Sequence, residues 1–274
     1  MKFRPMIHRR ITPQRLAKAI GLGLCLQAIS LSGSAQSYYL LTSDSSLAQV
    51  LESQPNMPSA AVPVAGLNPG DQLVAIDVRP QTGRLYGLGQ NPKTGSAQLY
   101  ILEMGRSGAS AIAIGSTGSF VNAAGNPMPL FANGFDMDFN PTVDRIRVVA
   151  SNGMNFRMNP NDGAFVDGNL GGAAGSIAGL NPDAALNGGA TQGMGTAYSN
   201  NEANAALTTQ FTLDSSTNAL YIQQPPNAGT LINSVPIMLG SNVLDFPPMA
   251  DLILRQASMP ASVVGRSRAW QQQC

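Results

Sequence analysis

The sequence is poor in the side chains that enzymes most often use for nucleophilic, metal and redox chemistry. Its 274 residues include one histidine, His8, and two cysteines, Cys25 and Cys274, and charged residues make up only 11% of the chain. After residue 18 the only lysine is Lys93. The histidine and one of the cysteines lie in the first 35 residues, so the nature of that segment decides which chemistries remain.

The first 35 residues have the features of a secretory signal peptide. A basic region without acidic residues precedes an apolar stretch from Ala19 to Leu31, and the small residues Gly33 and Ala35 stand before Gln36. The apolar stretch is shorter than the ~20 residues that a membrane-spanning helix needs. We therefore predict a signal peptide over residues 1–35, no retained transmembrane helix, and export to the periplasm or the extracellular space.

Removal of this leader would exclude several classes of active site. A Ser-His-Asp triad, a Cys-His pair and a histidine-ligated zinc or copper site all need a histidine. Haem and iron–sulfur groups would lose their usual donors, and no intrachain disulfide could form with Cys274 alone. What remains is the chemistry of carboxylates, arginine, amides and hydroxyls.

The charge of the exported part disfavours nucleic acid as a partner. The whole chain has 16 Lys+Arg and 15 Asp+Glu, and six of the basic residues but none of the acidic ones lie in the leader. The remainder has 10 basic and 15 acidic residues, a net charge of −5, and offers no basic patch for phosphates.

Short apolar runs alternate with turn signals along the rest of the chain. Each unit is an apolar strand, a turn of Asp, Asn, Pro, Ser or Gly, and a second apolar strand. Examples are "LVAIDVRPQTGRLYGLG" (Leu73–Gly89), "FDMDFNPTVDRIRVVA" (Phe135–Ala150) and "QFTLDSSTNALYIQ" (Gln210–Gln223). Repeated strand–turn–strand hairpins are typical of bladed architectures, so we predict an all-β, β-propeller-like domain over residues 36–245.

Two segments depart from this rhythm. The Gly-, Ala- and Asn-rich stretch from Asp167 to Gly195 is interpreted as a long surface loop, or alternatively as a flexible binding loop. Residues 246–274 gain Gln, Arg and Met and are predicted to form a divergent or disordered C-terminal tail. A fold that is incomplete at this end is the alternative, and it would leave a sheet edge exposed.

Several of these motifs resemble a known family. "AIDVRPQTGRLYGLG", "GFDMDFNPTVDRIRVVASNGMNFRMNPNDGAFVDG" and "LYIQQPPNAGTL" are similar to the motifs of a family of bacterial exported proteins called domain of unknown function 4394. The resemblance extends from about Tyr38 to Leu231. It implies a β-rich, propeller-like exported protein, and it assigns neither an activity nor a catalytic residue.

The charged hairpin Gly134–Val149 carries the most suggestive chemistry, and three interpretations compete for it. In the first, Asp136 and Asp138 pair across the strands with Arg145 and Arg147, on either side of a tight turn. In the second, Asp136, Asp138 and Asn140 provide alternating oxygen ligands for calcium, although the spacing is not that of an EF-hand. In the third, the two carboxylates act as acid and base, but nearby arginines would lower both pKa values and hinder a general acid.

The sequence as a whole favours binding over catalysis. We expect an exported, non-catalytic β-rich binding or scaffold module whose partner is a protein or an envelope component, with no cofactor other than an optional calcium ion. A carboxylate-dependent hydrolase on the same scaffold, assisted by calcium, is the alternative. Tyr86, Tyr100 and Tyr221 end apolar strands, and we expect them to pack in the core rather than to form a sugar platform.

Overall fold

The turn signals of the sequence divide the chain into antiparallel β-strands. The computed structural model describes residues 37–105, 108–245, 250–253 and 262–265. The predicted signal peptide, residues 1–35, and most of the predicted tail lie outside these residues. Within the described part, strands provide the regular structure and two single-turn 3₁₀ helices, η1 (Asn169–Gly171) and η2 (Pro226–Ala228), are the only helical segments.

Three groups of four consecutive strands form antiparallel meanders, which we call blades 1, 2 and 3. Such a four-stranded unit is the building block of β-propellers, so the predicted all-β, propeller-like architecture is confirmed.

Blade 1 contains β4 (Gln72–Val78), β5 (Leu85–Gln90), β6 (Ala97–Gly105) and β7 (Gly108–Gly118). Blade 2 contains β10 (Phe135–Asn140), β11 (Arg145–Ala150), β12 (Asn155–Met158) and β13 (Phe165–Val166). Blade 3 contains β14 (Gly193–Tyr198), β15 (Gln210–Asp214), β16 (Ala219–Gln223) and β17 (Leu231–Pro236).

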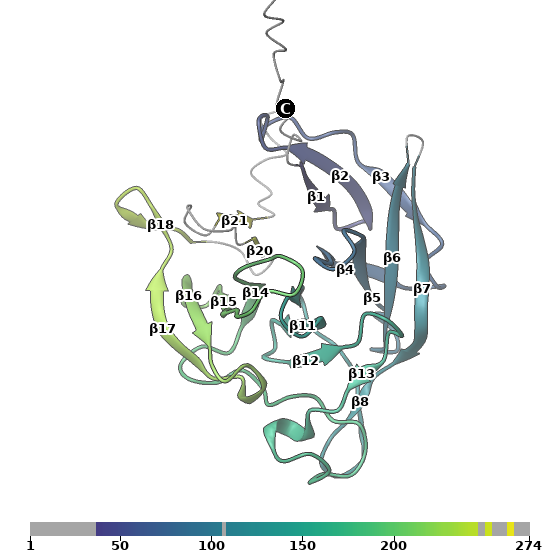
Figure 1. Cartoon of the computed structure of the whole chain (residues 1–274), viewed down its shortest axis with the longest axis vertical. Helices are drawn as coiled ribbons and strands as arrows, with labels where there is room; N and C mark the ends of the chain where they lie inside the picture. The colour runs from purple at the N-terminus through teal and green to yellow at the C-terminus, as the bar shows by residue number, and fades with distance from the viewer. Residues whose placement is uncertain (1–36, 106–107, 246–249, 254–261, 266–274) are drawn as a thin grey trace, which may run out of the picture. The chain divides into compact units, whose positions relative to one another are not determined.

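Blade 1 is extended by the first three strands of the described chain, β1 (Ser37–Leu41), β2 (Ser46–Leu51) and β3 (Val62–Ala65). Strand β3 pairs in parallel with β7, which gives a seven-stranded sheet in the order β1-β2-β3-β7-β6-β5-β4. The edge strands β1 and β4 contact each other, so this sheet is nearly closed on itself, as Figure 1 shows.

Three short strand pairs complete the described structure. They are β8 (Phe120–Val121) with β9 (Pro127–Met128), β18 (Met238–Leu239) with β19 (Asn242–Val243), and β20 (Ala250–Ile253) with β21 (Ser262–Gly265). The last pair lies within the predicted tail, and β20 contacts β14. Across the described ranges, no helix has the length and apolar character required to cross a bilayer.

The first strands of the blades lie next to one another, in the order β4, β10, β14. Their apolar side chains, and those of the second and third strands, pack between successive blades. Tyr86 of blade 1 meets Phe139 of blade 2 edge to face, with ring centroids 5.2 Å apart. Buried apolar side chains of blades 1 and 2 form one continuous core. Burial of each large apolar side chain contributes about 1.5–3 kcal/mol to the free energy of unfolding.

Tyr100 on β6 is tightly packed, so substitutions at this residue or beside it should disturb the core of blade 1. As expected, Tyr86, Tyr100 and Tyr221 are all buried, and Tyr100 has no exposed surface. Its ring occupies the space beside Gly89, where a β-carbon would lie 2.5 Å from Cε2 of Tyr100. Its hydroxyl donates a hydrogen bond to Oδ2 of Asp71 (2.7 Å) and accepts one from the amide of Asn68 (2.9 Å). Burial, and then the hydrogen bond to Asp71, raise the pKa of Tyr100 above its usual range.

This raised pKa predicts a loss of stability at alkaline pH. Tyrosine in the unfolded chain ionises near pH 10, whereas Tyr100 in the folded chain keeps its proton to higher pH. The contribution of Tyr100 is therefore complete below about pH 10 and is lost as pH rises from there towards the folded-state pKa. Tyr100→Phe should cost about 1–3 kcal/mol at pH 8, because Asn68 and Asp71 lose a partner. Urea unfolding between pH 8 and 11 should show the gap between wild type and variant narrowing above pH 10, and a constant gap would contradict the assignment.

Candidate functional site

The charged hairpin is formed by β10 and β11 of blade 2. The two strands pair in antiparallel register, with Asp138 opposite Arg147 and Asn140 opposite Arg145. The side-chain oxygen of Asn140 accepts hydrogen bonds from the amides of Thr142 (3.0 Å) and Val143 (3.2 Å), which closes the turn. The predicted strand–turn–strand hairpin is therefore confirmed, and Asn140 is the residue that shapes its turn.

Asp136 and Asp138 reach from blade 2 to the backbone of blade 3. Oδ2 of Asp136 accepts a hydrogen bond from the amide of Thr196 (2.6 Å), and Oδ2 of Asp138 accepts one from the amide of Tyr198 (2.9 Å). Oδ1 of Asp136 also accepts the amide of the next residue, Met137 (2.9 Å). Both aspartates are buried, where a hydrogen bond to a charged acceptor stabilises by about 1.5–3 kcal/mol.

The same device joins blade 1 to blade 2. Asp77, near the end of β4, accepts the amide of Phe139 on Oδ2 (2.9 Å) and the amide of Val78 on Oδ1 (2.7 Å). We call this arrangement, in which an aspartate on the first strand of one blade accepts an amide from the first strand of the next, a carboxylate clasp. One clasp joins blades 1 and 2, through Asp77, and two join blades 2 and 3, through Asp136 and Asp138.

The three candidate calcium ligands thus have structural partners. Asp136 and Asp138 accept amides across the interface between blades, and Asn140 accepts amides within its own turn. A metal ion bound by these oxygens would compete with each of those hydrogen bonds. In the parts of the chain that the structure describes, no group of three or more His, Cys, Asp or Glu side chains could hold a metal ion.

Arg147 forms its ion pair with a residue far from the hairpin. Its Nη1 lies 2.5 Å from Oδ2 of Asp183, and Arg157 on β12 binds both oxygens of the same carboxylate at 2.7 and 2.8 Å. Asp183 and the Arg147 side chain are almost completely buried. The cross-strand pairing that the sequence predicts for the arginines is therefore wrong for Arg147, whose ion pair is with Asp183. The guanidinium of Arg145 donates to the backbone oxygen of Asp144.

Asp183 belongs to the glycine-rich segment from Asp167 to Gly195. Residues 171–180 of this segment are mostly exposed, whereas Asn181, Asp183 and Leu186 are buried, and Leu186 packs against side chains of blades 2 and 3. Amide and hydroxyl side chains extend the buried network from Arg147 into blade 3: Asn155, Tyr198, Gln210 and Gln223 are joined by hydrogen bonds of 2.9–3.5 Å. The surface-loop interpretation therefore holds for the first part of the segment only.

A second charged contact joins blades 1 and 2 at the turns. Arg79 forms an ion pair with Asp144 and donates to the amide oxygen of Asn161 (2.7 Å). The hydrogen bond to Asp144 above all, and then the one to Tyr86, raise the pKa of Arg79 above its usual range. Its hydrogen bond to the hydroxyl of Tyr86 (3.2 Å) fixes the guanidinium against the core.

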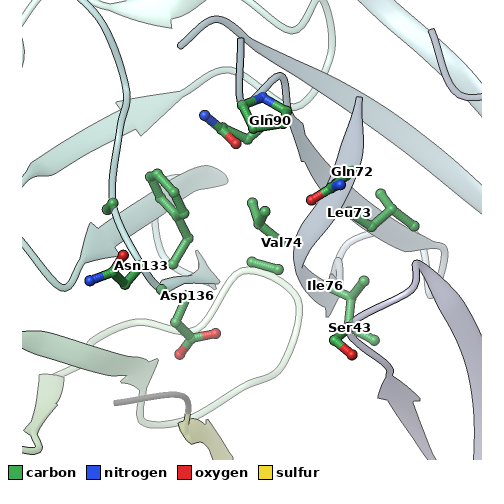
Figure 2. Close-up of a pocket in the computed structure, with 13 residues that line it drawn as sticks. Ser43, Gln72, Leu73, Val74, Ile76, Gln90, Asn133 and Asp136 are labelled. Atoms are coloured by element: carbon green, nitrogen blue, oxygen red, sulfur yellow. The ribbon is translucent and has the colours of Figure 1, made fainter. Parts of the chain in front are cut away.

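A pocket of about 250 Å³ lies between the first strands of blades 1 and 2. Its apolar lining includes Val74, Ile76 and Phe135, and its polar lining consists of Ser43, Gln72, Gln90, Asn133 and Asp136. Figure 2 shows the polar side chains of the lining arranged around Val74, with the carboxylate of Asp136 directed away from it. No Lys, Arg or His is among the described residues that line the pocket.

The pocket lies where a carboxylate clasp is missing. Asp77 and Asp138 stand at the same place in their blades, three residues before the prolines of the turns, Pro80 and Pro141. Asp136 is two residues before Asp138, and the corresponding residue of blade 1 is Ala75. Ala75 and Asp136 both line the pocket. Blades 1 and 2 are therefore fastened at one end of β4 by Asp77, and the short side chain of Ala75 leaves room beside β10.

The sequence predicts the hairpin but not the partners of its side chains. The clasps join residues 60 to 62 positions apart, a spacing that matches one blade. An alignment of the "AIDVRP" and "MDFNP" stretches would have placed Asp77 beside Asp138 as a repeated feature. No residue-type signal marks the acceptor strand, because the partner is a backbone amide.

Comparison with known proteins gives a family and no activity. A sequence model for a domain of unknown function (DUF4394) matches residues 46–252. That range includes all three blades, the three clasp aspartates and the pocket except Ser43. A search of curated proteins finds no match.

The buried arginine pair predicts a large effect of one substitution. Asp183→Ala would leave Arg147 and Arg157 without their carboxylate, and removal of one partner of a buried ion pair costs about 3–5 kcal/mol. Urea unfolding of the purified protein should measure this loss. The control is Glu202→Ala, an exposed change that should stay within about 0.5 kcal/mol of wild type. Equal effects of the two substitutions would show that the arginines do not depend on Asp183.

Proposed function

The chain belongs to the family defined by the domain of unknown function DUF4394, and we propose that it acts as an exported, non-catalytic binding module. The partner is a protein or an envelope component that contacts the rigid first strands of the blades. The pocket between β4 and β10 is the binding site in this proposal.

One observation carries the proposal: the carboxylates that could have performed chemistry are bonded to the backbone. Asp77, Asp136 and Asp138 each accept at least one amide from the next blade. Asp183 is held by two arginines. A general acid or base must be able to reach a substrate and exchange a proton with it, and these side chains are directed into interfaces between blades.

A second candidate function rests on the position of Asp136. This residue lines the pocket, and a carboxylate in a pocket is the minimum that a hydrolase of sugars, lactones or esters would need. Its two oxygens accept the amides of Met137 and Thr196, which supports a structural role. The binding module is therefore the better supported of the two.

Two substitutions separate these functions. Asp136→Ala and Asp138→Ala should each lower the free energy of unfolding by about 1–3 kcal/mol, because a buried amide loses its acceptor. Wild type should show no turnover of chromogenic glycosides, lactones or esters, with millimolar calcium or with EDTA. Calcium should not raise the unfolding midpoint, as binding to the native state would.

The opposite pattern would establish the hydrolase. In that case the wild type would turn over one of these substrates, and Asp136→Ala would abolish turnover without lowering the free energy of unfolding. A calcium-dependent rise in the midpoint that Asp138→Ala removes would establish the metal site.

The exported location rests on the leader sequence. The basic region, the apolar stretch Ala19–Leu31 and the small residues before Gln36 support cleavage at that position. Expression of the whole chain in a bacterial host, followed by mass measurement of the protein from the periplasm and medium, should give a chain that begins at Gln36. Recovery of the uncleaved chain in the cytoplasm would contradict export.

A further inference from the structure

We propose that the pocket between blades 1 and 2 binds a single uncharged sugar unit. This inference rests on the proposed binding function and names the chemical class of the ligand. The size of the pocket, the charge of its lining and the polar groups at its rim all favour such a ligand.

The volume favours a small ligand. Pockets for drug-sized molecules usually measure roughly 300–1,000 Å³, and this one measures about 250 Å³. It is bounded by β4 and β10, which Asp77 joins directly, and Tyr86 on the neighbouring strand β5 packs against Phe139 of β10, so its width is fixed by the scaffold. One sugar ring fits this description better than an extended chain does.

The charge of the lining excludes anionic ligands. The lining residues include one ionisable side chain, Asp136, and no cationic group to bind a phosphate, sulfate or carboxylate. Asp136 would repel an anion. A cation gains little from it, because the carboxylate is buried and directed towards the amide of Thr196 on β14.

The rim offers groups that match hydroxyls. The side chains of Ser43, Gln72 and Asn133 are exposed and have no hydrogen-bond partner among the described residues. Side-chain amides and hydroxyls both donate and accept hydrogen bonds, as sugar hydroxyls do. Val74, Ile76 and Phe135 line the same pocket and would provide an apolar floor for the C–H face of a sugar ring.

A bound sugar would contact both blades, with Gln72 on β4 and Asn133 immediately before β10. It would thereby join the strands at the place where Ala75 stands in the position of an aspartate. The ligand would substitute for the missing clasp, so its binding should stabilise the interface between blades 1 and 2.

N-acetyl-D-glucosamine is a suitable probe because it is neutral and carries hydroxyls and an amide. Saturation-transfer NMR with the purified protein should detect binding, and the unfolding midpoint should rise with millimolar sugar. Gln72→Ala and Asn133→Ala should each weaken binding about three- to tenfold, since each removes one or two hydrogen bonds. Gln54→Ala and Asn201→Ala change exposed amides elsewhere and should leave binding unchanged. Val74→Phe should fill the pocket and abolish binding, with the unfolding midpoint as a check on folding.

Charged and peptide probes complete the test. D-glucosamine, D-glucuronate and the capped peptide N-acetyl-Ala-Ser-amide should bind at least tenfold more weakly than the neutral sugar. Equal or tighter binding of any of these probes, equal effects of rim and control variants, or no signal from the sugar would each overturn the inference. In those cases the absence of turnover would still support a binding module. Release of a reaction product from a glycoside probe would instead overturn the proposed function itself.

Discussion

Successive blades are held together by hydrogen bonds from backbone amides to aspartate side chains. Within a blade the strands are joined by ordinary ladders of backbone hydrogen bonds, but the first strands of neighbouring blades do not pair in this way. Asp77, Asp136 and Asp138 provide the acceptors that a neighbouring strand would otherwise supply. Apolar packing brings the blades together without fixing their relative position, because the hydrophobic effect has no direction. The clasps set that position.

The buried ion pairs of blade 2 perform a related task with different chemistry. Asp183 comes from a part of the glycine-rich segment that forms no strand, yet it fixes two arginines at the interface with blade 3. A buried pair of this kind gains little net stability over an apolar contact, because desolvation of the charges offsets much of their attraction. The pair instead fixes the positions of neighbouring segments, because Arg147 also binds Asn155 and Asn227, which come from different parts of the chain. The segment thus helps to hold blades 2 and 3 in their relative position.

The sequence predicted the fold class better than it predicted the site. Strand–turn–strand units depend on local signals, such as the Asn140 turn and the apolar alternation of β10 and β11. A window of about fifteen residues contains all of these signals, so the hairpin can be predicted from it. The partner of Arg147 was not predictable in the same way, because Asp183 lies 36 residues further along in a segment of low complexity. The pocket could not be predicted either, because it depends on the absence of a carboxylate at Ala75, which is recognised only when blade 1 is compared with blade 2.

The direction of the clasp has a consequence for how such a chain can diverge. The blade that provides the carboxylate must keep an aspartate of the right length at the right place. The blade that receives it contributes an amide that every residue except proline possesses, and the clasp uses no side-chain atom of the receivers Phe139, Thr196 and Tyr198. Each clasp therefore requires a particular side chain on one blade only, and what restricts the receiving residues is the packing and hydrogen bonding of their own buried side chains.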